Sequence, residues 1–156
     1  MISPSLGIRL LPIFVPFATQ WVRMQEKRAL RFGVPLNGEE LADASALGVR
    51  NPDRVRLLRV EKMPTFENAA LRPLAGVAER CFAHTAGLTL NYAILVQRDY
   101  WRERSLVAHE LVHVGQYERL GGIGPFLRLY LRECLVPRYP NGPLEQEAIL
   151  ESARIR

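Results

Sequence analysis

The chain has few of the residues that cross-link a small protein or bind metal through sulfur. It holds two cysteines in 156 residues, Cys81 and Cys134, and they form no CxxC pair. Such spacing indicates neither a disulfide framework nor a cysteine zinc knuckle, and apolar neighbours surround both residues, as is common for buried thiols. We therefore expect two free thiols, a reducing compartment and a cytoplasmic location.

Long apolar runs are also missing. The most apolar stretch, residues 10–18, is too short to cross a bilayer and contains Pro12 and Pro16, which interrupt a helix. A cleaved signal peptide is not expected, because Arg9 is the only early charge and no small-residue cleavage site follows. We expect residues 1–36 to form an apolar arm and then a surface helix over 17–31. The arm would pack on the domain or make transient contact with a membrane.

Concentrated basic clusters are absent as well. The 21 lysines and arginines outnumber the 16 acidic residues and give a net charge of +5. Most of them are arginines spread in ones and twos, without the stacking aromatics that nucleic-acid readers place between basic residues. We expect solvated faces and no nucleic-acid partner.

The composition and pattern of what is present predict one globular domain, residues 1–156. Periodicity and helix-breaking residues divide the chain into segments. The predicted helices are 17–31, 39–47, 68–81, 102–120, 125–135 and one that opens at Pro143, and the predicted strands are 55–60 and 87–96. Strands that precede the terminal helices indicate an α+β domain with a small sheet.

One motif carries chemistry, the HExxH segment His109-Glu110-Leu111-Val112-His113 on the predicted helix 102–120. Four residues turn an α-helix by about 400°, so both histidines share one face and can reach a single tetrahedral Zn²⁺. Glu110 lies beside that face, where it can take a proton from a zinc-activated water as general base. The composition gives roughly 0.005 chance matches to this motif, so accident is a weak explanation.

A catalytic zinc needs a third protein ligand. The metzincin pattern would place glycine and histidine where Gln116 and Arg119 stand, so that class is excluded. The remaining histidine, His84, lies 25 residues upstream of His109. The other candidates are two carboxylates on the last helix, Glu145 and its rival Glu147, both of which would also suit the first turn of a helix through its dipole.

The arrangement resembles the gluzincins, whose second helix supplies a glutamate ligand in an ExxA(D) pattern. Glu145 and Ala148 match that pattern, whereas Ile149 replaces the acidic residue that often supports a histidine ligand, and Glu151 is the candidate substitute for that role. Residues 88–150 also look like a small bacterial family of uncharacterised zincin-like proteins. The segments that carry this resemblance are residues 109–122, Phe126-Leu127 and 143–148.

The resemblance implies a minimal gluzincin-like fold, with residues 88–150 as its metal-site core and an edge strand able to bind an extended peptide. The strand 88–96 is the candidate for such pairing. Tyr139, in the loop before Glu145, is a candidate catalytic donor to an oxyanion. Tyr117 shares the helical face of His113 and is a candidate to orient a ligand or line the cleft, but we expect it to pack. His84 is a second candidate for the oxyanion role, but we expect an ordinary surface residue.

These residues favour a zinc-dependent hydrolase, a metallopeptidase that acts on a peptide or protein substrate. Its ligands would be His109, His113 and Glu145, with Glu110 as base. The alternative is a non-catalytic module in which zinc holds the C-terminal helices together. A third hypothesis is a peripheral membrane or nucleic-acid binder that uses the basic charge and the apolar N-terminus.

Overall fold

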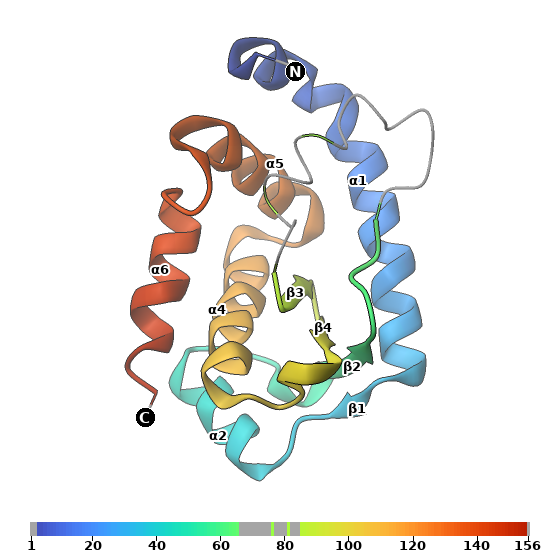
Figure 1. Ribbon diagram of the computed structural model, residues 1–156, viewed down its shortest axis with the longest axis vertical. Helices are drawn as coiled ribbons and strands as arrows, with labels where there is room; N and C mark the ends of the chain where they lie inside the picture. Colours follow the sequence, from blue (N-terminus) through green and yellow to red (C-terminus); the bar gives the residue numbers. More distant parts are fainter. Residues whose placement is uncertain (1–2, 66–75, 77–80, 82–84, 156) are drawn as a thin grey trace.

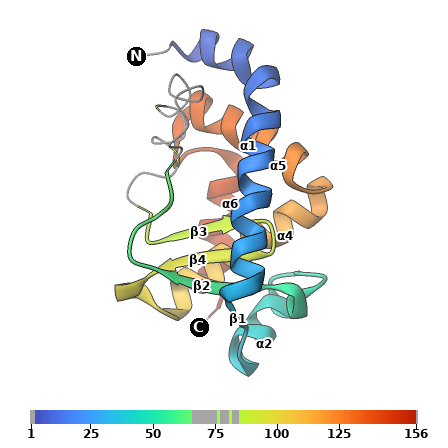
Figure 2. The same ribbon diagram turned by 90° about the vertical axis from the view of Figure 1, so that its right-hand side faces the viewer.

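The chain folds as a small mixed sheet enclosed by helices, which confirms the expected α+β class. The computed structural model describes residues 3–65, 76, 81 and 85–155. The predicted helix 68–81 therefore falls almost wholly outside the described residues. Helix α1 crosses one face of the sheet, and the C-terminal helices α4 and α6 lie on the other side (Figures 1 and 2).

A continuous helix, α1 (Pro4–Phe32), replaces the expected arm and shorter helix. Pro12 and Pro16 lie inside it, so the prediction of a break was wrong. An interior proline costs a helix about 3 kcal/mol, and burial of an apolar face against the rest of the domain offsets that cost. The buried face consists of Gly7, Leu11, Phe14, Val15, Ala18, Val22 and Ala29.

Within the described residues, the sheet has four strands in the order β1-β2-β4-β3. The central pair, β2 (Arg56–Val60) and β4 (Ala93–Gln97), is parallel, and the outer strands pair antiparallel with it. The outer strands are β1 (Val34–Pro35) and β3 (Gly87–Leu90), of which β3 is buried along its length. Strand β3 thus ends the sheet on the side that faces α4.

The predicted strand 87–96 is a hairpin, so that prediction was wrong in its topology. Leu90 pairs with Ala93, and the chain reverses through Asn91 and Tyr92. Asn91 has a φ of 60°, in the left-handed region that asparagine tolerates better than most residues. The reversal brings residues 87–90 to the sheet edge instead of extending a single strand.

Strand β4 separates two apolar cores because its side chains alternate between the faces of the sheet. Ala93 and Leu95 contact the core formed with α1 and α5 (Ile123–Glu133). Ile94 and Val96 contact the core formed with α2 (Gly38–Ala46) and α4 (Arg104–Leu120). The sheet thereby fixes α4 relative to both cores.

The helix boundaries of the C-terminal half follow local signals. Helix α4 ends at Leu120 and is capped by Gly121, whose φ of 95° gives the left-handed conformation that glycine allows. Helix α6 (Pro143–Ser152) opens with Pro143 in its first turn, as predicted. Short turns complete the described structure at Pro52–Arg54, Arg98–Tyr100 and Cys134–Arg138.

The two cysteines are joined as a disulfide, so the expectation of free thiols was wrong. Their Cα atoms lie 5.8 Å apart, a separation that a disulfide spans. The pairing was missed because distance along the sequence says little about distance in space. Cysteine usage therefore gives no support to a reducing compartment.

Candidate metal centre

Two helices bring the three predicted ligands together. His109 and His113 occupy one face of α4, as their spacing predicts. Glu145 lies in the first turn of α6, which packs beside α4 (Figure 1). Glu133 at the end of α5 accepts a hydrogen bond from the Leu144 backbone N–H at 2.9 Å and so anchors the start of α6.

The donor atoms of these side chains converge at nearly equal distances. The two Nε2 atoms of His109 and His113 are 3.2 Å apart. Glu145 places Oε1 at 3.1 Å from Nε2 of His109 and Oε2 at 3.3 Å from Nε2 of His113. Ligands at about 2.0 Å from a tetrahedral zinc are separated by about 3.3 Å. The spacing therefore suits a single small cation.

The cluster sits in a cavity whose central space of about 30 Å³ can hold an ion or one to two waters. His113 and Glu145 are buried, whereas the His109 side chain is 20% exposed. Glu110 and Tyr139 line the same cavity. Among the described residues, this is the one group of His, Cys, Asp or Glu side chains whose donor atoms lie close enough to hold a metal.

The electrostatics of the cavity favour positive charge. Burial alone would raise the pKa of Glu145, but hydrogen bonds from His109 and His113 lower it to about 2. Burial opposes charge on His113, yet its hydrogen bond to Glu145 and the charge of Glu110 raise its pKa above the ordinary value. The ionised Glu145 carboxylate thus attracts either a proton or a divalent cation to this point.

Gln116 holds His113 in the orientation that a metal ligand needs. Its Oε1 lies 2.8 Å from Nδ1 of His113, and its Nε2 donates to the Leu144 carbonyl at 2.8 Å and to Glu147 at 2.9 Å. Two acceptors around Nε2 fix the orientation of the amide, so Oε1 must accept from His113. Nδ1 then carries the proton, and the lone pair of Nε2 points at the cluster.

The rival carboxylate Glu147 lies outside the cluster. It accepts hydrogen bonds from Gln116 and, at 2.7 Å, from Arg119. Glu151 pairs with Arg154 on the surface, so it does not support a histidine. The supporting role expected of Glu151 falls instead to Gln116.

Strand β3 positions the predicted base. The Thr89 hydroxyl donates to Oε2 of Glu110 at 2.6 Å and also lies 3.0 Å from the Glu110 carbonyl. A Cβ atom at position 87 would come within 2.7 Å of Oε1 of Glu110, so this close approach requires Gly87. Through Thr89 and Gly87, the edge strand thereby contacts the carboxylate of Glu110 and orients it within the cavity.

Three tyrosines surround the cavity in different ways. Tyr130 donates to Oε2 of Glu145 at 3.1 Å. Burial, followed by the charges of Glu145 and Glu110, raises the pKa of Tyr139 to about 12, so its phenol remains a neutral donor. Tyr117 is buried and stacks on Phe126 with ring centres 3.7 Å apart, an arrangement that serves packing. His84 lies outside the described residues.

Sequence reasoning missed Thr89, Gln116 and Tyr130 as site residues. Thr89 is a polar residue in an otherwise apolar strand, and Gln116 lies three residues after His113 on the same helical face. Both positions offered a usable signal. Tyr130 offered none, because a tyrosine on an amphipathic helix looks like any other core residue.

Comparisons of the chain with protein-family models, curated proteins and solved structures return no match.

Proposed function

We propose that the protein is a zinc-dependent hydrolase of the gluzincin kind, with His109, His113 and Glu145 as metal ligands. Two imidazoles and a carboxylate are the donor set of catalytic zinc sites that leave a fourth position for water or substrate. Imidazole donors argue against calcium and magnesium, which prefer oxygen ligands throughout. The near-tetrahedral spacing of the three donor atoms carries the proposal.

Zinc, when bound, would acidify water toward neutral pH and polarise a substrate carbonyl. Glu110 would accept the proton of the attacking water and pass it to the leaving amine. Thr89 and Gly87 keep its carboxylate at the cavity wall, and Tyr139 would donate to the oxygen on which negative charge develops.

The position of β3 supports a peptide substrate. This strand ends the sheet beside Glu110, and an extended peptide can add to such an edge through main-chain hydrogen bonds. Because the residues of β3 are themselves buried, we expect only a thin, extended chain to reach it. We therefore propose that the protein is a peptidase of narrow specificity.

The decisive experiment compares zinc content and hydrolysis of quenched fluorescent peptides across variants. We expect one zinc per chain, and a loss of turnover of about 10²- to 10⁴-fold with zinc retained in Glu110→Gln. His113→Ala and Glu145→Gln should lose zinc, whereas Glu147→Gln should keep it. Protein purified without chelator that contains no zinc would refute the proposal.

A structural role for the same site is the second candidate, because its side chains join three helices. Gln116 of α4 bonds to α6, and Tyr130 of α5 bonds to Glu145 of α6. Under this alternative, chelation lowers the unfolding temperature, while Glu110→Gln changes no function of the protein. Zinc-dependent turnover that Glu110→Gln abolishes would exclude it.

A further inference from the structure

The outward face of α1 carries an apolar stripe that the domain does not cover. Its members are separated by seven, four and seven residues, so at about 100° per residue they lie within about 20° of one line along the helix. Their exposed fractions are 48% for Leu6, 63% for Ile13, 55% for Phe17 and 60% for Met24. Large side chains of this kind in one continuous line mark an interaction surface.

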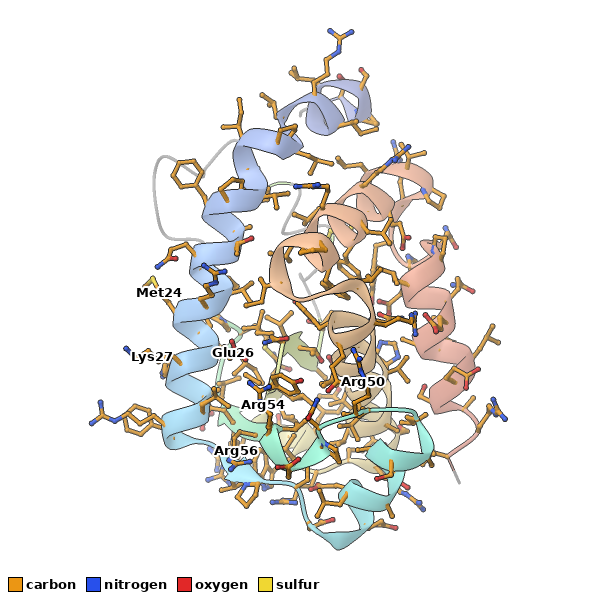
Figure 3. All side chains as sticks on the ribbon, turned by 180° about the vertical axis from the view of Figure 1, so that it is seen from behind. Met24, Glu26, Lys27, Arg50, Arg54 and Arg56 are labelled. Carbon is orange, nitrogen blue, oxygen red and sulfur yellow. A yellow bond between two sulfur atoms is a disulfide. The ribbon has the colours of Figure 1, made fainter. Side chains whose placement is uncertain are left out.

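Positive charge flanks this stripe, and no described acidic residue pairs with it. Five exposed basic residues belong to α1, and none forms an ion pair with another described residue: Arg9, Arg23, Lys27, Arg28 and Arg31. The one acidic residue of the helix, Glu26, turns inward and accepts a hydrogen bond from Asn91 at 2.8 Å. Figure 3 shows Met24 and Lys27 pointing away from the domain and Glu26 pointing toward it.

The inner face of α1 fixes how this surface can be used. By length and composition alone, α1 could cross a membrane. Its buried residues, such as Phe14, Ala18 and Val22, contribute to the core shared with α5 and the sheet. Surrounding the helix with lipid would expose that core. A helix packed on one side against its own domain can lie along a bilayer surface while that core stays covered.

We propose that the outer face of α1 docks the protein on an anionic phospholipid surface. The stripe suits the boundary between headgroups and acyl chains, and the flanking cations suit negatively charged headgroups. On the α5 side, Arg23 and Arg128 line a groove together with Val15 and two prolines. We expect a headgroup phosphate to bind between the two guanidinium groups. Apolar and cationic features then act together along one helix.

Charge and apolar character together favour an anionic bilayer over two other binding partners, a second copy of the chain and a nucleic acid. A second copy of the chain would bring two sets of these cations together and be repelled. A nucleic acid would satisfy the cations but leave the aliphatic stripe unmatched, and the stripe offers only one aromatic ring, Phe17, for base stacking. An anionic bilayer satisfies both features.

Vesicle flotation tests the proposal. The whole chain should bind phosphatidylcholine vesicles with about one-third phosphatidylserine at least roughly tenfold more strongly than phosphatidylcholine alone, and high salt should weaken this binding. Ile13→Glu combined with Phe17→Glu should abolish it, and Lys27→Glu combined with Arg31→Glu should abolish the preference for phosphatidylserine. Removing metal with a chelator should change nothing.

The matched control is Ile149→Glu combined with Leu150→Glu, which changes two exposed apolar residues on α6. This variant should bind as the wild type does, and circular dichroism establishes that each variant is folded. Equal binding to both vesicle types, or an equal loss in the control, would overturn the proposal. So would a dimer that the Ile13 and Phe17 changes dissociate without any vesicle binding, or bound protein that only detergent releases.

Discussion

Nδ1 of His113 lies 2.8 Å from Oε1 of Gln116, three residues further along the same helix. Gln116 is fully buried, and its amide nitrogen is held by two acceptors, so the amide cannot turn without breaking hydrogen bonds in the core. His113 is therefore oriented by a residue that binds no metal. Such supporting groups commonly tune metal affinity by 10- to 100-fold.

Replacing Gln116 should weaken metal binding while leaving the ligands in place. We expect Gln116→Leu to lower zinc affinity by about 10- to 100-fold, because His113 loses the acceptor that fixes its ring. Competition against a fluorescent chelator measures the change. Gln20→Leu, an exposed glutamine on α1, is the control, and an unchanged affinity in Gln116→Leu would contradict the assigned role.

Gly87→Ala should impair catalysis without removing metal. The added Cβ would lie 2.7 Å from Oε1 of Glu110, so the carboxylate must move. A displacement of this size can cost about 100-fold in turnover. The measurement is kcat at saturating peptide together with zinc content. Gly38→Ala, where an added Cβ meets nothing within 4 Å, should leave both unchanged.

Tyr139→Phe should reduce kcat more than it changes KM. The pKa of Tyr139, raised to about 12, keeps the phenol protonated at neutral pH and able to donate a hydrogen bond as charge develops. Loss of one such donor costs about 10²- to 10³-fold in turnover. Tyr100→Phe removes an exposed hydroxyl from the turn that precedes α4 and serves as control. Equal kinetics of the two variants would rule out a catalytic Tyr139.

Acid should weaken the attachment of α2 to α4. The hydrogen bond from Arg104 lowers the pKa of Asp43 below its ordinary 3.8. A carboxyl whose pKa is lower in the folded state stabilises that state above the unfolded value and loses the contribution as pH falls through the folded value. Wild type should therefore exceed Asp43→Asn in urea midpoint at pH 7, and the difference should shrink below pH of about 3.8. A constant difference would contradict this.

Reduction of the Cys81–Cys134 disulfide should destabilise the fold. The bond joins residues 53 positions apart, and closing a loop of that length corresponds to about 4 kcal/mol of unfolded-state entropy. Urea unfolding with and without a reductant measures the loss, with Cys81→Ser combined with Cys134→Ser as the permanently reduced reference. Identical midpoints would indicate that the bond contributes little.

The sequence predicted those parts of the molecule that local rules control. The four-residue spacing of His109 and His113 fixes their shared face, and Gly121 and Pro143 mark where helices end and begin. Periodicity also located α5 within a few residues of its observed bounds. These signals act over one or two turns of chain, so no tertiary contact was needed to read them.

Contacts between residues far apart in the chain could not be predicted from the sequence. Nothing near Pro12 or Pro16 shows that burial on the sheet keeps the helix continuous, and nothing near Cys81 shows that Cys134 lies beside it. Asn91 turns a strand into a hairpin through one positive φ, which a run of strand-forming residues conceals. Each of these wrong predictions concerns a feature that depends on contacts with distant parts of the chain, which can override local propensities.

The three candidate ligands, His109, His113 and Glu145, come from two helices with a third between them in the chain, so the proposed site can assemble only late in folding. A chain in which α4 has formed but α6 has not yet docked presents two imidazoles and no third ligand. It has neither the oxygen donors of Glu145 nor the Leu144 carbonyl that holds Gln116. Under the proposed function, reactive water would be generated only on a chain that has already closed, and partly folded neighbours would be spared premature cleavage.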